Sequence, residues 1–446
     1  MTVEPSIQET VLETIDNMKN QIIQAVSDLV KIQSVNPSYL GVKVEDVIGG
    51  EMRNNEVLRR KLNEMNFHTE MWEVIPKRAN LAGTRKGIGG GKSLILFGHI
   101  DSVPPGNLDL WKRSPFSGDI AEGKIWGRGS TDQKGSLVAA LFAIKAIDNA
   151  KLKLKGDLTF MSTIGEETGE GGAEGVIPGG VASAIDSGYR ADAAICTEPA
   201  PGIWITQPHL LWLRVSVNGK SAHSMLRREI VHSGGRGSEV AVSAIDKGIK
   251  MYDALRELER QWGITKKHPL FPPGHFSIGP NIIRAGPSDI LTPFIIPDTF
   301  TMDCCIWAHP EEDVNAVKEE LEHYINAVAS CDEWMKDHPP KLEWKLWWAP
   351  FKTPEDHPLV KTVSTAVKAV TGEAFTITGC LGVLDCAFVS SRGIPTVAVG
   401  VPNEGIVTAH AENEFIKIDD LIKMTKVFAL SILDWCRYEK AESSTT

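Results

Sequence analysis

Short apolar runs, each followed by imidazole or carboxylate residues, are the feature that most constrains the fold of this chain. The run KSLILFGHID ends with His99 and Asp101, and the run LTFMSTIG is followed by Glu166 and Glu167. A third run, DAAICTEP, contains Glu198 near its end. Short, continuously apolar runs are typical of strands that are buried on both faces of a parallel sheet. We therefore expect an α/β fold whose strand ends carry polar side chains.

Helical periodicity separates these runs. Apolar residues recur at helical spacing over 8–33, and a charged amphipathic pattern follows at 53–65. A further helix is predicted over 136–147. The same style returns late in the chain, with a predicted helix over 358–370 and the strand TVAVGV over 396–401. This alternation predicts a mainly parallel sheet flanked by helices.

The pattern changes in the middle of the chain. The stretches LLWLRVSVNG and FIIPDTFTMDCCIW alternate in the manner of antiparallel strands, and long amphipathic helices are predicted over 238–262 and 311–328. Residues 331–350, which include DHPPKLEW, are interpreted as a return linker. We therefore expect two domains: a larger α/β domain formed by residues 1–205 and 333–446, and an inserted smaller α+β domain at 206–332.

Composition excludes several classes of partner. The 446 residues are 42% hydrophobic and 23% charged, which fits a soluble globular protein of roughly two domains. The formal net charge of -10 argues against nucleic acid or an anionic membrane as the main partner. The acidic N-terminal stretch lacks the pattern of a signal peptide, and no run of about 18 apolar residues occurs. We expect a cytoplasmic protein.

The seven cysteines show no Cys-x-x-Cys spacing. This favours buried reduced thiols over a disulfide framework or a thiolate zinc site. Any bound metal must then use oxygen and nitrogen ligands.

His99 and Asp101 lie two residues apart at a strand end. A lone histidine there is more often structural, but residues two apart in an extended chain point the same way. Asp101 can then accept the second ring N–H of His99 and fix the nitrogen that faces a metal.

Asp132 lies in GRGSTDQKG, just before the helix predicted over 136–147. It can be read simply as a helix N-cap or turn residue. As a carboxylate on a glycine-flanked turn, it can also bridge two cations about 3.5 Å apart, the separation usual in two-metal hydrolases.

Glu166 and Glu167 are adjacent acids, a pair that usually indicates a solvated loop. Because they end an apolar run, their side chains point in different directions, so one can bind metal while the other acts as a general base. Glu198 and His410 are each weak signals alone. Together, these segments place candidate metal ligands at the carboxyl ends of several strands, where open α/β sheets build their sites.

These stretches resemble the co-catalytic zinc peptidases and amidohydrolases, a family that includes aminoacylases, acetylornithine deacetylase, succinyl-diaminopimelate desuccinylase and glutamate carboxypeptidase. The matching stretches occur in the family's order and span almost the whole chain: GHIDSVPPG, WGRGSTDQKGSL, TIGEETGEGG, CTEP, GKSAHS and AHAENEFI.

The resemblance implies one or two divalent metal ions, zinc first, with manganese or cobalt as alternatives. One ion would be held by His99, Asp132 and Glu198, and the other by Asp132, Glu167 and His410. It also implies that Glu166 is the general base and that Asp101 supports His99. The middle domain would be a lid and homodimerisation module whose His223 reaches the active site of the partner subunit and stabilises the oxyanion; the alternative is a surface histidine in a strand-to-helix turn.

Three positions depart from the family pattern. Where many members have Asn-x-x-Pro, this chain has Phe294-Ile295-Ile296-Pro297, and where they have Asp-x-Arg, it has Asp303-Cys304-Cys305. Where they have Gly-Gly-Ser/Thr-Asp, it has Gly382-Val383-Leu384-Asp385. An arginine fork is the usual way to hold a carboxylate, so an acyl-amino acid or a peptide C-terminus is not the expected substrate.

Phe294, Cys305 and Leu384 are therefore candidate substrate residues for a small, flat or aromatic molecule. Arg284 is a candidate for a relocated anion contact. The alternative reading is that these side chains only pack the smaller domain.

Three functional hypotheses follow. The first is hydrolysis of a C–N amide bond of a small molecule by a metal-activated water. The second is an aminohydrolase that releases ammonia or an amine from an aromatic or ureido compound. The third is a catalytically silent metal-binding relative, against which the presence of Glu166 argues.

Overall fold

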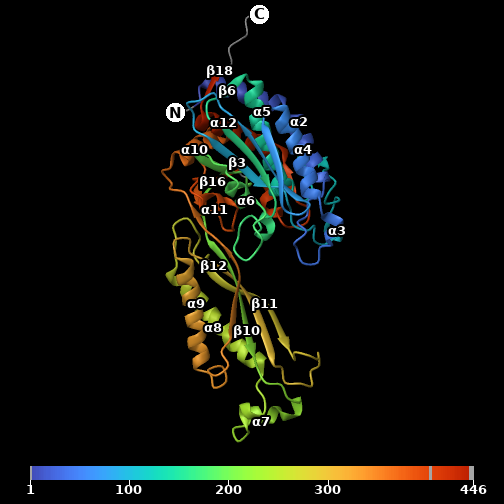
Figure 1. The fold of residues 1–446 in the computed structure, drawn as a ribbon, viewed down its shortest axis with the longest axis vertical. Helices are drawn as coiled ribbons and strands as arrows, with labels where there is room; N and C mark the ends of the chain where they lie inside the picture. The colour runs from blue at the N-terminus through green and yellow to red at the C-terminus, as the bar shows by residue number, and fades with distance from the viewer. Residues whose placement is uncertain (1–2, 401–403, 441–446) are drawn as a thin grey trace, which may run out of the picture. The chain divides into compact units, whose positions relative to one another are not determined.

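The computed structural model describes residues 3–400 and 404–440, which fold into two compact units (Figure 1). The larger unit comprises Met1–Gln207, Phe351–Cys380 and Leu384–Thr446. The smaller unit comprises Pro208–Pro350 and Leu381–Val383.

The larger unit is built on a nine-stranded sheet. Its strands, in spatial order, are β1 (His68–Ile75), β2 (Arg78–Arg85), β7 (Leu158–Thr163), β3 (Leu94–His99), β8 (Ala193–Cys196), β16 (Thr396–Val399), β9 (Ile203–Gln207) and β14 (Phe351–Lys352), and β15 (Ile377–Gly379) pairs with β9. The central strands β7, β3, β8 and β16 are parallel, while β1, β2 and β14 join through antiparallel pairs. This confirms the α/β class, with a sheet that is parallel at its centre and mixed at its flanks.

Helices cover this sheet (Figure 1). They are α1 (Pro5–Asn17), α2 (Lys19–Lys31), α3 (Val44–Val47), α4 (Gly50–Glu64), α5 (Gly135–Asn149), α6 (Val181–Asp186), α10 (Pro358–Thr371), α11 (Cys386–Ser390) and α12 (Ile418–Cys436). The sequence of α5, GSLVAALFAIKAIDN, is apolar on almost every side, and the helix is buried along nearly its whole length against α12 and β3. Since α5 begins three residues after Asp132, its packing fixes one side of the candidate site.

The pattern over 8–33 forms two helices and not one. Met18 ends α1 and precedes α2, with a backbone conformation (φ -92°, ψ 2°) outside the helical range. The apolar spacing continues across Met18, so periodicity alone does not reveal the break. Two small sheets complete the unit: β4 (Ile120–Ala121), β5 (Lys124–Trp126) and β17 (Phe415–Lys417) form one, and β6 (Leu152–Leu154) and β18 (Tyr438–Lys440) form the other.

The smaller unit is a four-stranded sheet with two long helices. The strand order is β11 (Ser277–Gly286), β12 (Thr299–Ala308), β10 (His209–Asn218) and β13 (Lys341–Trp348), and every pair is antiparallel. Alternate residues of β10 are buried in a core shared with α8 (Ala244–Thr265) and α9 (Val314–Ser330). The antiparallel pairing predicted for the two alternating stretches is confirmed.

Two expectations for this unit are wrong. Residues 341–348, interpreted as part of a linker, form β13, which pairs with β10 because Trp344 and Trp347 pack against the core. The helix expected from 238 begins at Ala244, where the Ser243 side chain caps it by accepting from the backbone N–H of Asp246.

None of the seven cysteines, all of which lie among the described residues, forms a disulfide bond. Five are buried as expected, whereas Cys305 is half-buried and Cys331 is exposed. Within residues 3–400 and 404–440, no helix has the length and apolar character needed to cross a membrane.

Candidate metal centre

The site lies at the carboxyl ends of the parallel strands of the larger unit. His99 is the last residue of β3 and pairs in register with Thr163, the last residue of β7. Glu166 and Glu167 follow β7 in a short 3-10 turn, η3 (Glu166–Thr168). Glu198 lies two residues after the end of β8. Parallel neighbours end at one edge of the sheet, so these side chains come together, as the sequence analysis predicted.

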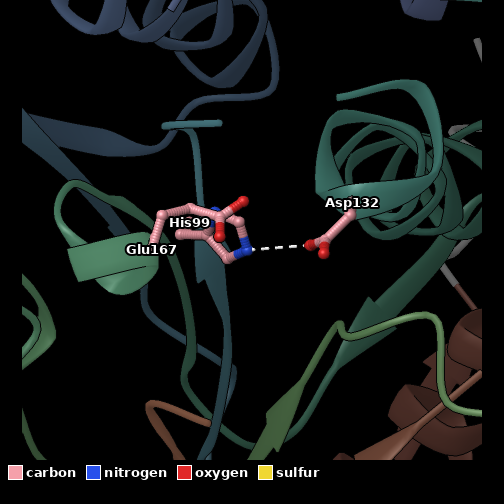
Figure 2. Close-up of side chains that lie close together, drawn as sticks. All are labelled: His99, Asp132 and Glu167. Carbon is pink, nitrogen blue, oxygen red and sulfur yellow. Dashed lines mark hydrogen bonds and ion pairs between the residues drawn. The ribbon is translucent and has the colours of Figure 1, made fainter. Parts of the chain in front are cut away.

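His99 is the buried centre of the cluster. Its Nε2 lies 3.0 Å from Asp132 Oδ1, 3.6 Å from Glu198 Oε1 and 3.9 Å from Glu166 Oε2. Figure 2 shows His99, Asp132 and Glu167 converging from three different elements. One ligand atom from each of these three residues lies within 4.8 Å of the other two, a spacing that a single ion can bridge.

A second histidine lies on the other side of Asp132. His410 Nε2 is 3.3 Å from Asp132 Oδ2 and 3.0 Å from Glu167 Oε2. The two oxygens of Asp132 therefore face different imidazoles. The backbone of His410 is left-handed (φ 62°), a conformation that a non-glycine residue rarely adopts and that often occurs at functional positions.

The electrostatics of the cluster favour a bound cation. Burial and the neighbouring carboxylates Glu198 and Glu167 raise the pKa of Glu166 well above its usual range, although His99 opposes this. Burial and the charge of Asp132 raise the pKa of Glu167 to about 6, against the effect of His410.

The two imidazoles respond to the same negative field. Hydrogen bonds to Asp132 and Glu167 raise the pKa of His410 to about 10. Burial alone would lower the pKa of His99, but its bonds to Asp101 and Asp132 raise it well above its usual value.

Donor chemistry supports the same reading. The cluster contains four buried or half-buried carboxylates and only two imidazoles, and ionising all four carboxylates away from water is costly without a cation. Glu167 Oε1 is a buried oxygen with no hydrogen-bond partner among the described residues. Oxygen and nitrogen donors of this kind suit zinc, manganese or cobalt.

Contrary to what the sequence pattern suggests, the carboxylate of Asp101 is not the main acceptor for the second ring nitrogen of His99. The His99 Nδ1 atom is 3.0 Å from the main-chain oxygen of Asp101 and 3.5 Å from its carboxylate. The carboxylate instead accepts hydrogen bonds from the backbone N–H groups of Gly165, Glu166 and Glu167 at 2.9–3.3 Å. Asp101 therefore holds the turn that carries both glutamates as well as the ring of His99.

Glu414, in the AHAENEFI stretch, is a residue that the sequence analysis missed. Its carboxylate accepts from the backbone N–H groups of Gly129, Thr131 and Asp132, and from Arg128 Nη1 at 2.7 Å. Four donors thus converge on one buried side chain. The signal was present in the matching stretch, but a glutamate four residues after a histidine does not by itself indicate a bond to a loop 282 residues earlier.

Gln133 and Tyr39 also act on the cluster. The Gln133 amide donates to Glu198 Oε1 in a short contact and accepts from the Thr197 hydroxyl. Gly98 makes room for this amide, because a Cβ there would lie 1.8 Å from Gln133 Oε1. The Tyr39 hydroxyl donates to the main-chain oxygen of Glu167 at 2.9 Å.

The candidate substrate residues lie in both units. His223, Arg284, Phe294 and Cys305 belong to the smaller unit, and Leu384 belongs to the larger one. His223 and Phe294 are exposed, and their segments are adjacent, since the backbone N–H of Ser224 bonds to the Phe294 oxygen. Leu384 is buried, and its backbone bonds to the side chain of Gln207.

Arg284 and Cys305 lie near Asp303 on the sheet of the smaller unit. Arg284 Nη1 donates to Asp303 at 3.2 Å, and Arg214 makes a second ion pair with the same carboxylate. Cys305 lines an apolar pocket of about 310 Å³ together with Leu210, Trp212, Ile282 and Leu346.

The strand-end cluster of imidazoles and carboxylates has the ligand chemistry of a metal-dependent hydrolase. The sequence matches the pattern of peptidase family M20/M25/M40 over residues 95–434, and the chain belongs to this family.

Relatives and solved structures agree with this assignment. The chain is 32% identical to an N-formyl-4-amino-5-aminomethyl-2-methylpyrimidine deformylase of Halalkalibacterium halodurans, over 98% of this chain and 99% of that protein. The deformylase of the same name from Bacillus subtilis is 29% identical, over 96% of this chain and 97% of that protein. An M20 family metallo-carboxypeptidase from Sulfolobus solfataricus has the same fold, with a TM-score of 0.67, 20% identity and coverage of 93% of this chain and 99% of that chain.

The protein is thus a hydrolase that acts on carbon–nitrogen amide bonds of small molecules and uses divalent metal. This confirms the first of the three functional hypotheses at the level of reaction class.

Proposed function

We propose that the protein removes a small acyl group, formyl first, from an amide of a compact aromatic amine. The observation that carries this proposal is the identity of 32% to a formyl-aminopyrimidine deformylase along nearly the full length of both chains. The sequence supports it, because Cys305 stands where many family members have an arginine for a substrate carboxylate.

We propose that His99, Asp132 and Glu198 bind one divalent ion and that Asp132, Glu167 and His410 bind another, with zinc as the first candidate. The contacts of Asp132 support a bridging role, since each of its oxygens faces a different histidine. When bound, the ions lower the pKa of a water and polarise the scissile carbonyl.

Glu166 is the proposed general base. Its raised pKa, caused by burial and by the neighbouring carboxylates, suits a group that accepts a proton from water and then delivers it to the leaving nitrogen. Asp101 holds the backbone of Glu166 and so keeps the carboxylate beside His99.

His223 is the proposed donor to the carbonyl oxygen. Its Nδ1 accepts from the backbone N–H of Met225, so the neutral ring carries its proton on Nε2, where it can donate. We also propose that the chain forms a homodimer through the smaller unit and that His223 acts in the site of the partner subunit.

A complementation experiment tests the proposed role of His223 in the dimer. Glu166→Gln and His223→Ala are each expected to be inactive alone, and mixing them under conditions of subunit exchange should restore activity through one intact site per mixed dimer. A monomer by light scattering, or no recovery after verified exchange, would refute the arrangement.

The substrate proposal is tested with a panel of amides. We expect formate release from N-formyl derivatives of aromatic methylamines to be faster than hydrolysis of N-succinyl or N-acyl amino acids. Ammonia release without formate would favour the aminohydrolase instead. Arg284, Phe294, Cys305 and Leu384 are the proposed substrate residues, and Cys305→Arg should shift the preference toward substrates with a carboxylate.

We further propose a cytoplasmic location, which suits buried reduced cysteines. Cell fractionation with an antibody to the chain tests this proposal.

A further inference from the structure

A buried ion triad lies at the start of β2, outside the candidate metal centre. Arg78 donates to both oxygens of Glu51 at 2.6 Å, and its Nη1 donates to Glu170 Oε2 at 2.6 Å. Arg78 is 1% exposed, Glu51 2% and Glu170 8%. All three charged groups are therefore withdrawn from water.

Stability alone does not explain this triad. Replacing a buried ion pair with apolar side chains of similar volume often leaves a protein equally or more stable, because desolvation offsets the attraction. A more specific explanation for the triad is that it holds the backbone of the loop that contains Glu170 in one conformation.

The triad ends on the loop that carries the two catalytic-site glutamates. Glu170 closes a turn in which Gly165 and Gly169 both adopt left-handed backbone conformations (φ 81° and 80°) on either side of Glu166 and Glu167. The main-chain oxygen of Glu170 also accepts from the backbone N–H groups of Gly179 and Gly180, so hydrogen bonds hold both its side chain and its backbone.

Asn36 links this loop to Asp101. Its amide donates to Asp101 Oδ2 at 2.8 Å, to Thr168 Oγ1 at 3.0 Å and to Glu170 Oε2 at 3.4 Å. The Ser38 hydroxyl donates to the other oxygen of Glu170 at 2.5 Å. A continuous hydrogen-bonded path therefore runs from the ion triad to the carboxylate that holds the backbone of Glu166.

We propose that Arg78 and Glu170 are positioning residues, which hold the loop from Gly165 to Glu170 so that Glu166 and Glu167 face the two histidines. This inference rests on the proposed roles of Glu166 and Glu167. Its physical basis is that residues which hydrogen-bond to metal-binding side chains fix the orientation of those side chains. Losing such a residue therefore weakens metal binding or activity even though the residue does not touch the metal.

Glu170→Gln is the main test, because it keeps the shape of the side chain and removes its charge. We expect kcat to fall by about 10- to 100-fold, the usual cost of losing such support, with KM unchanged. Affinity for the divalent ion proposed to bind Asp132, Glu167 and His410, measured by competition with a chromophoric chelator, should also fall by about 10- to 100-fold.

Asp148→Asn is the matched control. Asp148 pairs at 2.6 Å with Arg85, the residue at the opposite end of β2, and this pair makes no contact with the loop. The control should keep wild-type kcat and metal affinity even where its melting temperature falls as far as that of Glu170→Gln.

The outcomes separate this inference from the proposed function. A wild-type protein that hydrolyses no amide would refute the function, while weaker metal binding by Glu170→Gln would still support the inference. If Glu170→Gln keeps wild-type kcat and metal affinity and loses only thermal stability, the inference is wrong. Should Glu170→Gln not fold, Ser38→Ala leaves the ion triad intact, and we expect a smaller loss of kcat in the same direction, whereas wild-type kcat would overturn the inference.

Discussion

Two of the loops that carry acidic groups of the metal centre, those with Asp132 and with Glu166, are held in different ways. The loop with Asp132 is clamped by Glu414, which accepts three backbone N–H groups and pairs directly with Arg128. The loop with Glu166 is clamped by Asp101, which also accepts three backbone N–H groups but reaches its nearest arginine only through Asn36 and Glu170.

The difference predicts how far each loop would move when one of its supporting side chains is replaced. One carboxylate, paired with one arginine, accepts the backbone N–H groups of three residues in the Asp132 loop, so a single change should loosen the group that faces both histidines. Support for Glu166 is spread over several side chains. Loss of one of them should displace the base and leave most of the site in place.

The largest expected effect removes the base itself. We expect Glu166→Gln to lower kcat by about 10³-fold or more, since general acid–base catalysis commonly contributes up to about 10⁴-fold. Bound metal, measured by elemental analysis, should be unchanged because Glu166 is not a proposed ligand. Appreciable remaining turnover would contradict the assignment of the base to this loop.

The second-largest expected effect comes from removing the carboxylate of Glu414, which holds the Asp132 loop. Glu414→Gln leaves the buried charge of Arg128 without its opposite charge, and removing one member of such a pair typically costs about 3–5 kcal/mol. We expect the free energy of unfolding in urea to fall by this order and metal binding to weaken at both proposed positions, which share Asp132.

A double variant sharpens this prediction. Glu414→Gln with Arg128→Met removes the stranded charge, so stability should recover in part while metal binding does not. Recovery of full metal affinity would show that Glu414 acts only on stability.

Breaking the distributed clamp should be milder. In Asp101→Asn, an NH2 group replaces one of the two carboxylate oxygens. This group is a donor and cannot accept a hydrogen bond from the backbone N–H groups, so the turn that carries Glu166 loses part of its support. We expect activity or metal affinity to fall by about 10- to 100-fold. A loss as severe as that of Glu414→Gln would mean that the two loops do not differ as described.

The smallest expected effect is on the pH dependence of metal binding. The pKa of His410 in the metal-free protein is raised to about 10 by its bonds to Asp132 and Glu167, so a metal ion must displace a proton at neutral pH. Apparent affinity should therefore rise as pH increases toward 10. Without metal, the protonated His410 stabilises the fold fully below its unfolded pKa, and this contribution is lost as pH rises through about 10.

Calorimetry in buffers of different ionisation enthalpy measures the protons released on binding. The number should be smaller in His410→Ala than in the wild type. Equal release, or affinity independent of pH, would contradict the raised pKa.

The sequence predicted the strand ends well and the supports poorly. His99, Glu166 and Glu198 each follow an apolar run, so the parallel arrangement of β3, β7 and β8 is enough to bring them together. Glu414 and Arg78 do not follow an apolar strand, so this pattern does not mark them as part of the site. Their partners lie far away in the chain, and a buried carboxylate that accepts backbone N–H groups has the same appearance in a sequence as a surface one.

The same distinction applies to the smaller unit. The alternation of β10 and β12 predicts their antiparallel pairing, whereas residues 331–350, with the stretch DHPPKLEW, suggest a linker where β13 forms. Its place in the sheet depends on Trp344 and Trp347 packing on the helices, which is a tertiary property.

The central claim is that the cluster around Asp132 is a divalent-metal centre that hydrolyses amides. The most direct measurement is metal content and formate release before chelation, after chelation and after re-addition of zinc, manganese or cobalt, in the wild type and in Asp132→Ala. We predict that chelation abolishes activity, that one of the three ions restores it in the wild type, and that Asp132→Ala neither holds metal nor recovers. Full activity in protein stripped of metal, or in Asp132→Ala, would contradict the account.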